Sequence, residues 1–208
     1  MSKEKLEALR ARGYDFDIQE VLLKGLRMWT ATPIMSSAFV LFVLSLNLAF
    51  YFYINDFALV YSLLLAPPLY SGFYLVANKL SKGEQVIYPD FFRGFGFFIP
   101  VVSIWLIGQL LTALGLIALV LPGIYLAVGY SFSVLFSIFG GFDFWQSLEE
   151  SRKLITVRWW KFLVFSLILV LINILAILPY GIGLVITLPV TFYATYAAFE
   201  DITKDSLS

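Results

Sequence analysis

Residues 94–142 read GFGFFIPVVSIWLIGQLLTALGLIALVLPGIYLAVGYSFSVLFSIFGGF, and none of these 49 residues is charged. The hydrocarbon core of a bilayer is about 30 Å thick, and a helix needs roughly 20 apolar residues to cross it. The stretch is therefore long enough for two membrane-spanning helices and the turn between them. A buried helix of a soluble domain needs no apolar run of this length, so the stretch indicates an integral membrane protein.

The rest of the chain shows the same character. Its 208 residues are 61% hydrophobic and 13% charged, with a mean hydropathy of +0.89, whereas soluble domains carry about 25% charged residues. We predict an all-α polytopic fold in which one membrane domain, residues 1–208, crosses the bilayer about six times in three hairpins. The predicted spans are residues 33–54, 57–79, 96–114, 116–139, 159–178 and 181–200.

The turn between the third and fourth spans has two candidate positions. Pro122-Gly123 is a typical turn dipeptide, and Gly115 is the competing site. We favour Gly115, because it precedes Pro122 by about the distance that separates Gly183 from Pro189 in the last hairpin.

The basic residues predict the orientation. All 14 Lys and Arg residues fall within residues 3–27, 79–93 and 152–161 or at Lys204. The three other connections between spans contain none. Since basic loops stay on the cytoplasmic side, we expect both termini to be cytoplasmic.

Two amphipathic helices are expected at the membrane surface. One lies in the cytoplasmic arm, residues 1–30, where apolar residues recur at helical spacing from Ile18 to Trp29. The other covers residues 143–156, with Asp143 as its N-cap and Gln146 at the capping-box position. Such helices lie in the headgroup plane, although each could instead simply continue into the next span.

The chain also suggests three copies of one unit, each with an interfacial helix and two spans. An aspartate opens each copy, and a proline followed by a tyrosine lies in each second span. We expect every even-numbered span to kink at its proline. Chance similarity between apolar segments is the alternative. The paired residues are Pro67 and Tyr70, Pro122 and Tyr125, and Pro189 and Tyr193.

The composition argues against several classes of function. The chain has no histidine and no cysteine, which removes the commonest ligands of zinc, copper and haem and the commonest general base. No charged residue lies within a span away from its ends, whereas ion-coupled transporters depend on such residues. We expect no catalytic residue, no cofactor, no metal and no nucleic-acid partner, and therefore no enzyme. Gln109 and Asn173 are expected to form hydrogen bonds between helices, worth about 1 kcal/mol each.

Several short motifs are similar to a known family. They are LPGIYL at 121–126, SLEESRKL at 147–154, Trp159-Trp160 and YGIGL at 180–184. In these motifs the chain resembles the DUF975-like bacterial membrane proteins and the membrane domain attached to some glycerophosphodiester phosphodiesterases. The resemblance covers most of the chain and implies a multi-pass fold in a bacterial cytoplasmic membrane. It implies no activity, because nothing here resembles the phosphodiesterase catalytic domain. One departure is Gly129-Tyr130, where the family often has a basic residue.

Two functional hypotheses remain. The first is a non-enzymatic scaffold, assembly or accessory component of a membrane complex, which would bind a membrane or cytoplasmic protein partner. Its docking surface would consist of Glu149, Glu150, Arg152 and Lys153. The second is a protein that handles membrane lipids or hydrophobic solutes. Its cavity would be lined by Tyr70, Tyr125, Tyr193 and Gln109.

Overall fold

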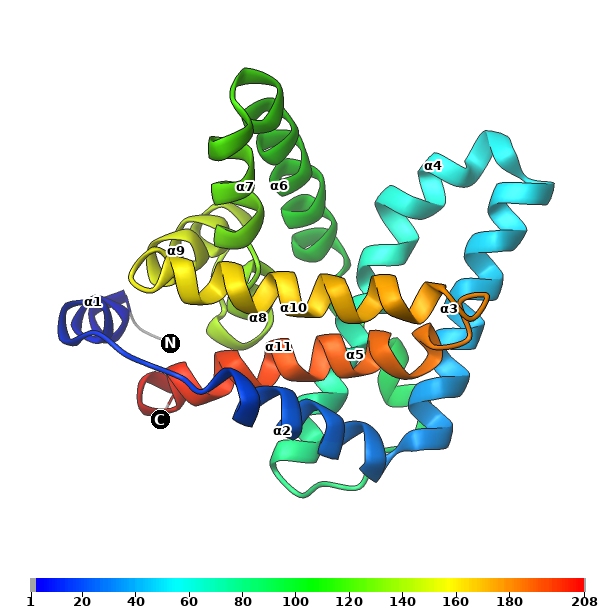
Figure 1. The fold of residues 1–208 in the computed structure, drawn as a ribbon, viewed down its shortest axis with the longest axis horizontal. Helices are drawn as coiled ribbons and strands as arrows, with labels where there is room; N and C mark the ends of the chain where they lie inside the picture. The colour runs from blue at the N-terminus through cyan, green and yellow to red at the C-terminus, as the bar shows by residue number, and fades with distance from the viewer. Residues whose placement is uncertain (1–2, 208) are drawn as a thin grey trace. The chain divides into compact units, whose positions relative to one another are not determined.

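Every element of the described chain is helical. The computed structural model describes residues 3–207, and within this range it contains helices and their connections but no strand (Figure 1). The prediction of an all-α fold is confirmed. Within the same range, the segments long and apolar enough to cross a membrane are Pro33–Tyr53, Asn55–Ser81, Tyr88–Ala118, Val120–Gly140 and Trp159–Ile177. The sixth predicted span, residues 181–200, falls in α11 (Leu184–Leu207), which is not among them. The number six therefore stays a prediction.

The chain divides into two compact units. Unit 1 comprises Met1–Ile18, Ile99–Ile168 and Ala198–Ser208. Unit 2 comprises Gln19–Phe98 and Leu169–Ala197. The helices α10 (Trp159–Ile177) and α11 supply residues to both. The sequence, which predicts one membrane domain over residues 1–208, does not anticipate this division.

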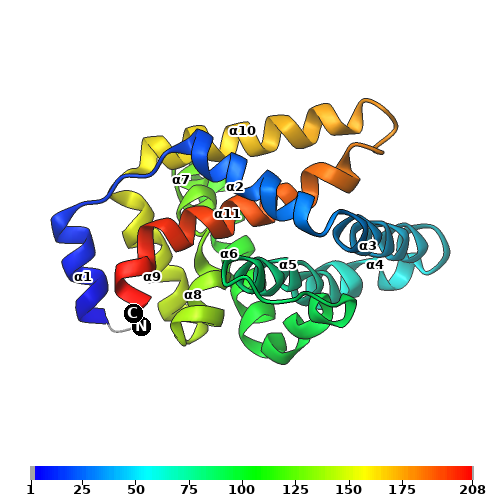
Figure 2. The ribbon, with the colours of Figure 1, turned by 90° about the horizontal axis from the view of Figure 1, so that it is seen from below.

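Unit 2 is built on a helical hairpin. The chain runs through α2 and α3 and then returns from the tip of the hairpin to α5 and η3 (Figure 1). α2 also lies along α11 in Figures 1 and 2, and a Cβ on Gly25 would lie 2.7 Å from the amide nitrogen of Ala194. Glycine is what lets these two helices touch. The elements are α2 (Ile18–Ala31), α3 (Pro33–Tyr53), η1 (Asn55–Phe57), α4 (Ala58–Val60), η2 (Tyr61–Leu65), α5 (Ala66–Ser81) and η3 (Tyr88–Phe97).

The turn before α5 is wider than that of an α-helix. η2 is a π-helix, and the amide of Ala66 donates to the carbonyl of Tyr61, five residues earlier. Pro67 and Pro68 follow directly. A proline has no N–H to donate, and its ring collides with the carbonyl four residues before it. The regular α pattern therefore gives way to a π turn here.

α5 and η3 pack at the distance of backbone contact. A Cβ on Gly72 would lie 1.8 Å from the carbonyl oxygen of Phe91, and one on Gly94 would lie 2.1 Å from that of Pro68. The buried carboxylate of Asp90 accepts from the amide of Ile87 at 2.9 Å and from Nζ of Lys79 at 2.8 Å. The aspartate that the sequence places at the start of the second repeat thus joins η3 to α5.

Unit 1 contains a second hairpin, whose turn corrects the sequence prediction. α6 (Phe98–Ala118) ends one residue before α7 (Val120–Gly129), and Leu119 between them is extended, with φ −158° and ψ 133°. The turn therefore lies neither at Gly115 nor at Pro122-Gly123. Both glycines instead allow the two helices to approach, since a Cβ on Gly115 would lie 3.0 Å from the Cα of Gly123.

The three prolines of the proposed repeats have different surroundings. Pro67 follows the π turn, Pro122 lies in the first turn of α7, and Pro189 lies inside α11. In the first turn a proline costs no hydrogen bond, because the amides there have no partner within the helix. The expected kink at Pro122 within the fourth span is therefore wrong.

The fourth predicted span, residues 116–139, is interrupted. Its first three residues are the end of α6, and the rest forms α7 and, after a short break, α8 (Ser133–Gly140). Ser151 of α9 (Phe144–Thr156) bridges the break: its hydroxyl donates to the carbonyl of Gly129 at 2.6 Å and accepts from the amide of Phe132 at 3.1 Å. Backbone groups in a membrane protein need such internal partners.

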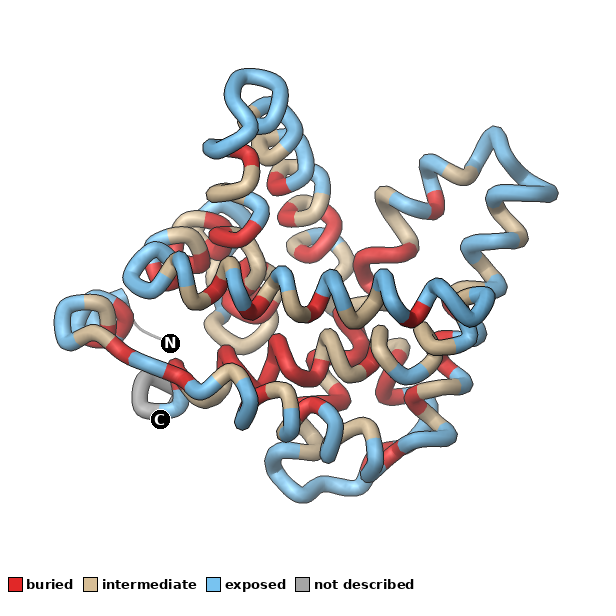
Figure 3. The backbone as a smooth tube through the Cα atoms, in the orientation of Figure 1, coloured by how far each residue is buried: buried red, intermediate tan, exposed pale blue. Residues whose placement is uncertain are grey.

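α9 is the amphipathic helix expected at residues 143–156. The side chain of Asp143 accepts from the amide of Gln146 at 2.8 Å, which confirms the predicted N-cap. The face that includes Leu148, Ser151 and Leu154 is buried (Figure 3). The helix thus packs on its own unit through this face, and its place in the headgroup plane stays a prediction.

Candidate functional site

An open groove of about 590 Å³ lies in unit 2, between α3 and the segment that joins α10 to α11. A cavity of this size falls in the range that accepts small ligands. No charged residue borders the groove. It is lined by Trp29, Ser37, Leu41, Leu44, Ser45, Leu48, Tyr180, Gly181, Ile182, Val185 and Ile186.

One wall of the groove is a single face of α3. Ser37, Leu41, Leu44 and Leu48 follow one another at intervals of three and four residues, so their side chains lie above one another on the helix. The twelve residues from Ser37 to Leu48 extend for about 16 Å, since each of the eleven steps between them rises 1.5 Å. This length, together with the apolar lining, suits a hydrocarbon chain rather than a compact polar molecule.

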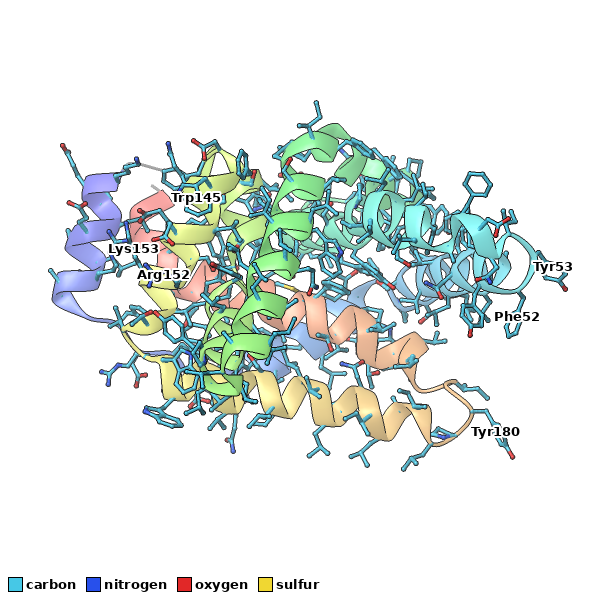
Figure 4. All side chains as sticks on the ribbon, turned by 90° about the horizontal axis from the view of Figure 1, so that it is seen from above. Phe52, Tyr53, Trp145, Arg152, Lys153 and Tyr180 are labelled. Carbon is cyan, nitrogen blue, oxygen red and sulfur yellow. The ribbon has the colours of Figure 1, made fainter. Side chains whose placement is uncertain are left out.

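The opposite wall is the turn into α11. Tyr180 and Gly181 both have positive φ, at 55° and 78°, and the amide of Gly181 donates to the carbonyl of Ile177 at 2.9 Å. A Cβ on Gly183 would lie 2.8 Å from that of Ala176, so glycine brings α11 close to α10. Tyr180 is 99% exposed (Figure 4).

The two walls meet at a hydroxyl group. Oγ of Ser37 accepts from the indole nitrogen of Trp29 at 3.3 Å and donates to the carbonyl of Val185 at 3.4 Å. These long hydrogen bonds place the ring of Trp29 at the α2 end of the groove. The groove therefore has one end with polar groups and an otherwise apolar floor.

The four residues predicted to line a cavity are divided between the two units. Tyr193 is fully buried in unit 2, where its hydroxyl is 2.8 Å from Oγ of Ser36. Tyr70, in the same unit, stacks on Phe192 with ring centroids 5.4 Å apart. Tyr125 and Gln109 belong to unit 1. None of the four borders the groove, because the tyrosines are engaged in packing and hydrogen bonds.

Asn173 forms the hydrogen bonds between helices that the sequence suggests. Its Nδ2 donates to Oγ1 of Thr191 at 2.7 Å, and its Oδ1 accepts from Oγ1 of Thr187 at 2.9 Å. These bonds join α10 to α11 within unit 2. Gln109 differs, since its side chain is exposed on α6.

The residues of the predicted docking surface do lie together on α9, but they are engaged within the chain. Arg152 donates from Nη2 to the carboxylate of Glu149 at 2.8 Å and from Nη1 to the hydroxyl of Tyr125 at 3.0 Å. The bond to Arg152 lowers the pKa of Glu149, and the same bond raises the pKa of Arg152. The bond from Arg152 to Tyr125 therefore joins α9 to α7.

Glu150 is engaged more deeply. It is 5% exposed and pairs with Arg10 of α1 (Lys3–Arg12) and, at 3.5 Å, with Nζ of Lys153. The hydroxyl of Tyr14 donates to the carbonyl of Leu154 at 2.7 Å on the same face. Trp145 and Lys153, both labelled in Figure 4, are exposed.

Sequence reasoning missed the groove because its two walls are more than 130 residues apart along the chain. The one available signal is the position of Ser37 and Ser45 among leucines on one face of α3. Comparison with known proteins leaves the interpretation of the groove to its geometry, because no protein-family model, no curated protein and no solved structure matches this chain.

Proposed function

We propose that this chain is a multi-pass membrane protein that handles lipid by holding an acyl chain in the groove of unit 2. The observation that carries the proposal is the open, uncharged groove of about 590 Å³ between α3 and residues 180–186. Its walls offer side chains of leucine, isoleucine and valine, and burial of apolar surface is the main source of affinity for such a ligand. No step of catalysis is part of this function.

The proposed setting is a bacterial cytoplasmic membrane with both termini in the cytoplasm. The distribution of the 14 basic residues supports this orientation. The resemblance to the DUF975-like family supports the bacterial setting, and membership of that family stays a prediction.

A photoactivatable phospholipid tests the proposal. The purified full-length protein is reconstituted with a lipid that carries a diazirine in its acyl chain, irradiated and digested, and the adducts are mapped by mass spectrometry. We expect adducts concentrated at residues 41–48 and 180–186. Adducts spread evenly over the other apolar exposed faces, such as the outer face of α10, would contradict the proposal.

Substitutions in α3 give a matched control. Ser45 borders the groove, whereas Asn47 is exposed on another side of the same helix. The indole ring of Ser45→Trp should fill the groove and reduce the adducts at 180–186 several-fold. Asn47→Trp adds a side chain of the same size outside the groove and should leave them unchanged.

An accessory role in a membrane complex is the second candidate. One observation favours it: Trp145 is exposed on α9, and so is Lys153, although Lys153 also pairs with Glu150. Affinity purification in mild detergent tests this role, with wild type compared with Trp145→Ala and Lys153→Gln. A stoichiometric partner that both changes release would support it, and a partner that neither change releases would exclude this surface.

A further inference from the structure

A second groove, of about 490 Å³, lies in unit 1 where α9 gives way to α10. Its walls are Asp15 and the six consecutive residues 156–161. These walls carry two cations, Arg158 and Lys161, and a single carboxylate. Three of the lining residues, Val157, Trp159 and Trp160, are apolar or aromatic. The groove therefore combines positive charge with aromatic surface, unlike the uncharged groove of unit 2.

The guanidinium of Arg158 has N–H groups that are not used in hydrogen bonds within the described part of the chain. Its Nε donates to the carbonyl of Tyr14 at 3.0 Å, which fixes the guanidinium at the groove. Its two terminal nitrogens form no hydrogen bond with any residue among 3–204. A guanidinium fixed at Nε presents these nitrogens as a fork, which matches the oxygens of a phosphate group.

Lys161 lines the same groove three residues after Arg158. Its Nζ donates to Oδ1 of Asp15 at 2.5 Å and lies 5.2 Å from the centroid of the Phe16 ring. Asp15 balances one of the two positive charges, so the groove keeps an excess of one. A bound anion would compete with Asp15 for Lys161. It would not compete for the terminal nitrogens of Arg158, which donate to no residue among 3–204.

The start of α10 adds N–H donors without acceptors. The indole nitrogen of Trp159 is enclosed and has no hydrogen-bond partner in the described part of the chain. Because this nitrogen is enclosed, a ligand in the groove does not reach it, and Trp159 contributes aromatic surface to the wall. No carbonyl among residues 3–207 accepts from the backbone amides of Trp159 and Trp160. The N-terminal end of a 19-residue helix also favours negative charge.

The surroundings favour a lipid as the source of the anion. Trp160 is 74% exposed beside the groove, and Val157 is exposed next to it. Tryptophan prefers the headgroup level of a bilayer, and α10 runs from this point as a candidate membrane span. We propose that the groove at the start of α10 binds the phosphate group of an anionic phospholipid, through Arg158, Lys161 and the N-terminal end of α10.

Native mass spectrometry of the purified full chain in mild detergent tests this site. Two lipids with identical acyl chains are compared: phosphatidylglycerol, and diacylglycerol, which lacks the phosphate. The uncharged groove of unit 2 would hold either lipid, so the preference for phosphatidylglycerol reports the new site alone. Arg158→Lys keeps the positive charge but removes the fork of N–H donors. It should reduce this preference about tenfold.

A double variant and a competitor complete the test. Arg158→Gln with Lys161→Gln should abolish the preference, whereas Lys82→Gln with Arg93→Gln removes two exposed basic residues of unit 2 and should preserve it. An equal loss in both double variants would overturn the site, as would an unchanged preference in Arg158→Lys. Displacement of phosphatidylglycerol by millimolar inorganic phosphate would overturn the lipid as the ligand, and its retention would support it.

Discussion

At Gly72 and Gly94 two backbones meet with no room for a side chain. A methyl group on these glycines would lie 1.8 and 2.1 Å from a carbonyl oxygen, far below any van der Waals contact. Backbone cannot move aside as a flexible side chain can, so the contact between α5 and η3 depends on these two residues having only hydrogen at that position. Glu150 is the polar counterpart, a buried carboxylate whose main partner, Arg10, is 140 residues away in the sequence.

Gly72→Ala should destabilise the protein by more than about 3 kcal/mol, because the new methyl group forces α5 and η3 apart. Thermal unfolding in mild detergent measures the change. Gly96→Ala is the matched control, since a Cβ there meets nothing within 4 Å. Equal midpoints for the two variants would show that α5 and η3 are not in backbone contact.

Glu150→Gln should cost about 2–4 kcal/mol of stability, because Arg10 then lies partly buried without its main counter-charge. Glu7 provides the comparison: it also faces Arg10, at 3.9 Å, but its side chain is 71% exposed. Glu7→Gln should change stability by less than about 0.5 kcal/mol. The unfolding midpoint in denaturant distinguishes the two, and a larger loss in Glu7→Gln would refute the buried pair.

At the scale of single elements, α9 stabilises the break between α7 and α8 through hydrogen bonds. Its cap at Asp143 fixes where it starts, and Ser151 then supplies both partners that the break between α7 and α8 lacks. A glycine at 129 allows this approach, since a Cβ there would lie 3.3 Å from Cγ of Arg152. The break is thus stabilised from outside its own helix.

Ser151→Ala should leave a carbonyl and an amide without partners, at a cost of about 1–3 kcal/mol for each group. Hydrogen exchange measured by mass spectrometry should show faster exchange at residues 130–133. Ser147→Ala removes a hydroxyl that donates to the carbonyl of Phe142 and should leave exchange at 130–133 unaffected. Slow exchange at 130–133 in the Ser151 variant would indicate another source of stabilisation.

At the scale of the whole molecule, the distribution of basic residues and the positions of the helices make one prediction about topology. The chain contains no cysteine, so a single introduced cysteine reports its own side of the membrane. Tyr53 and Tyr180 are exposed at helix turns without basic residues (Figure 4), whereas Lys82 lies in a basic connection. An impermeant thiol reagent applied to intact cells lacking an outer barrier should label Tyr53→Cys and Tyr180→Cys but not Lys82→Cys. The opposite pattern would invert the predicted orientation.

The sequence was most informative where charged or capping residues interrupt the apolar runs. The helical class follows from composition, and the start of α9 follows from Asp143 and Gln146. Within the apolar runs no such contrast exists, and the turn at Leu119 depends on how closely Gly115 and Gly123 approach, which is a property of two packed helices. The groove and the pair between Arg10 and Glu150 could not be predicted either, because each is formed by segments that are distant in the sequence. The predicted cavity stays a prediction because its residues are divided between the two units. A tyrosine beside a proline also does not show which hydroxyl it will bond, as Tyr193 bonds Ser36.

The π turn at Tyr61–Leu65 contains one more residue than a turn of a regular α-helix. Each residue turns an α-helix by about 100°, so the extra residue sets the rotation of everything before it relative to α5. In that rotation Tyr61 faces α3, where its hydroxyl donates to the carbonyl of Val43 at 3.0 Å and its ring stacks on Phe50. Deletion of one residue from this turn would restore a regular helix and rotate the hairpin tip by about 100° about the helix axis. The rotated tip would present a different set of side chains to the lipid.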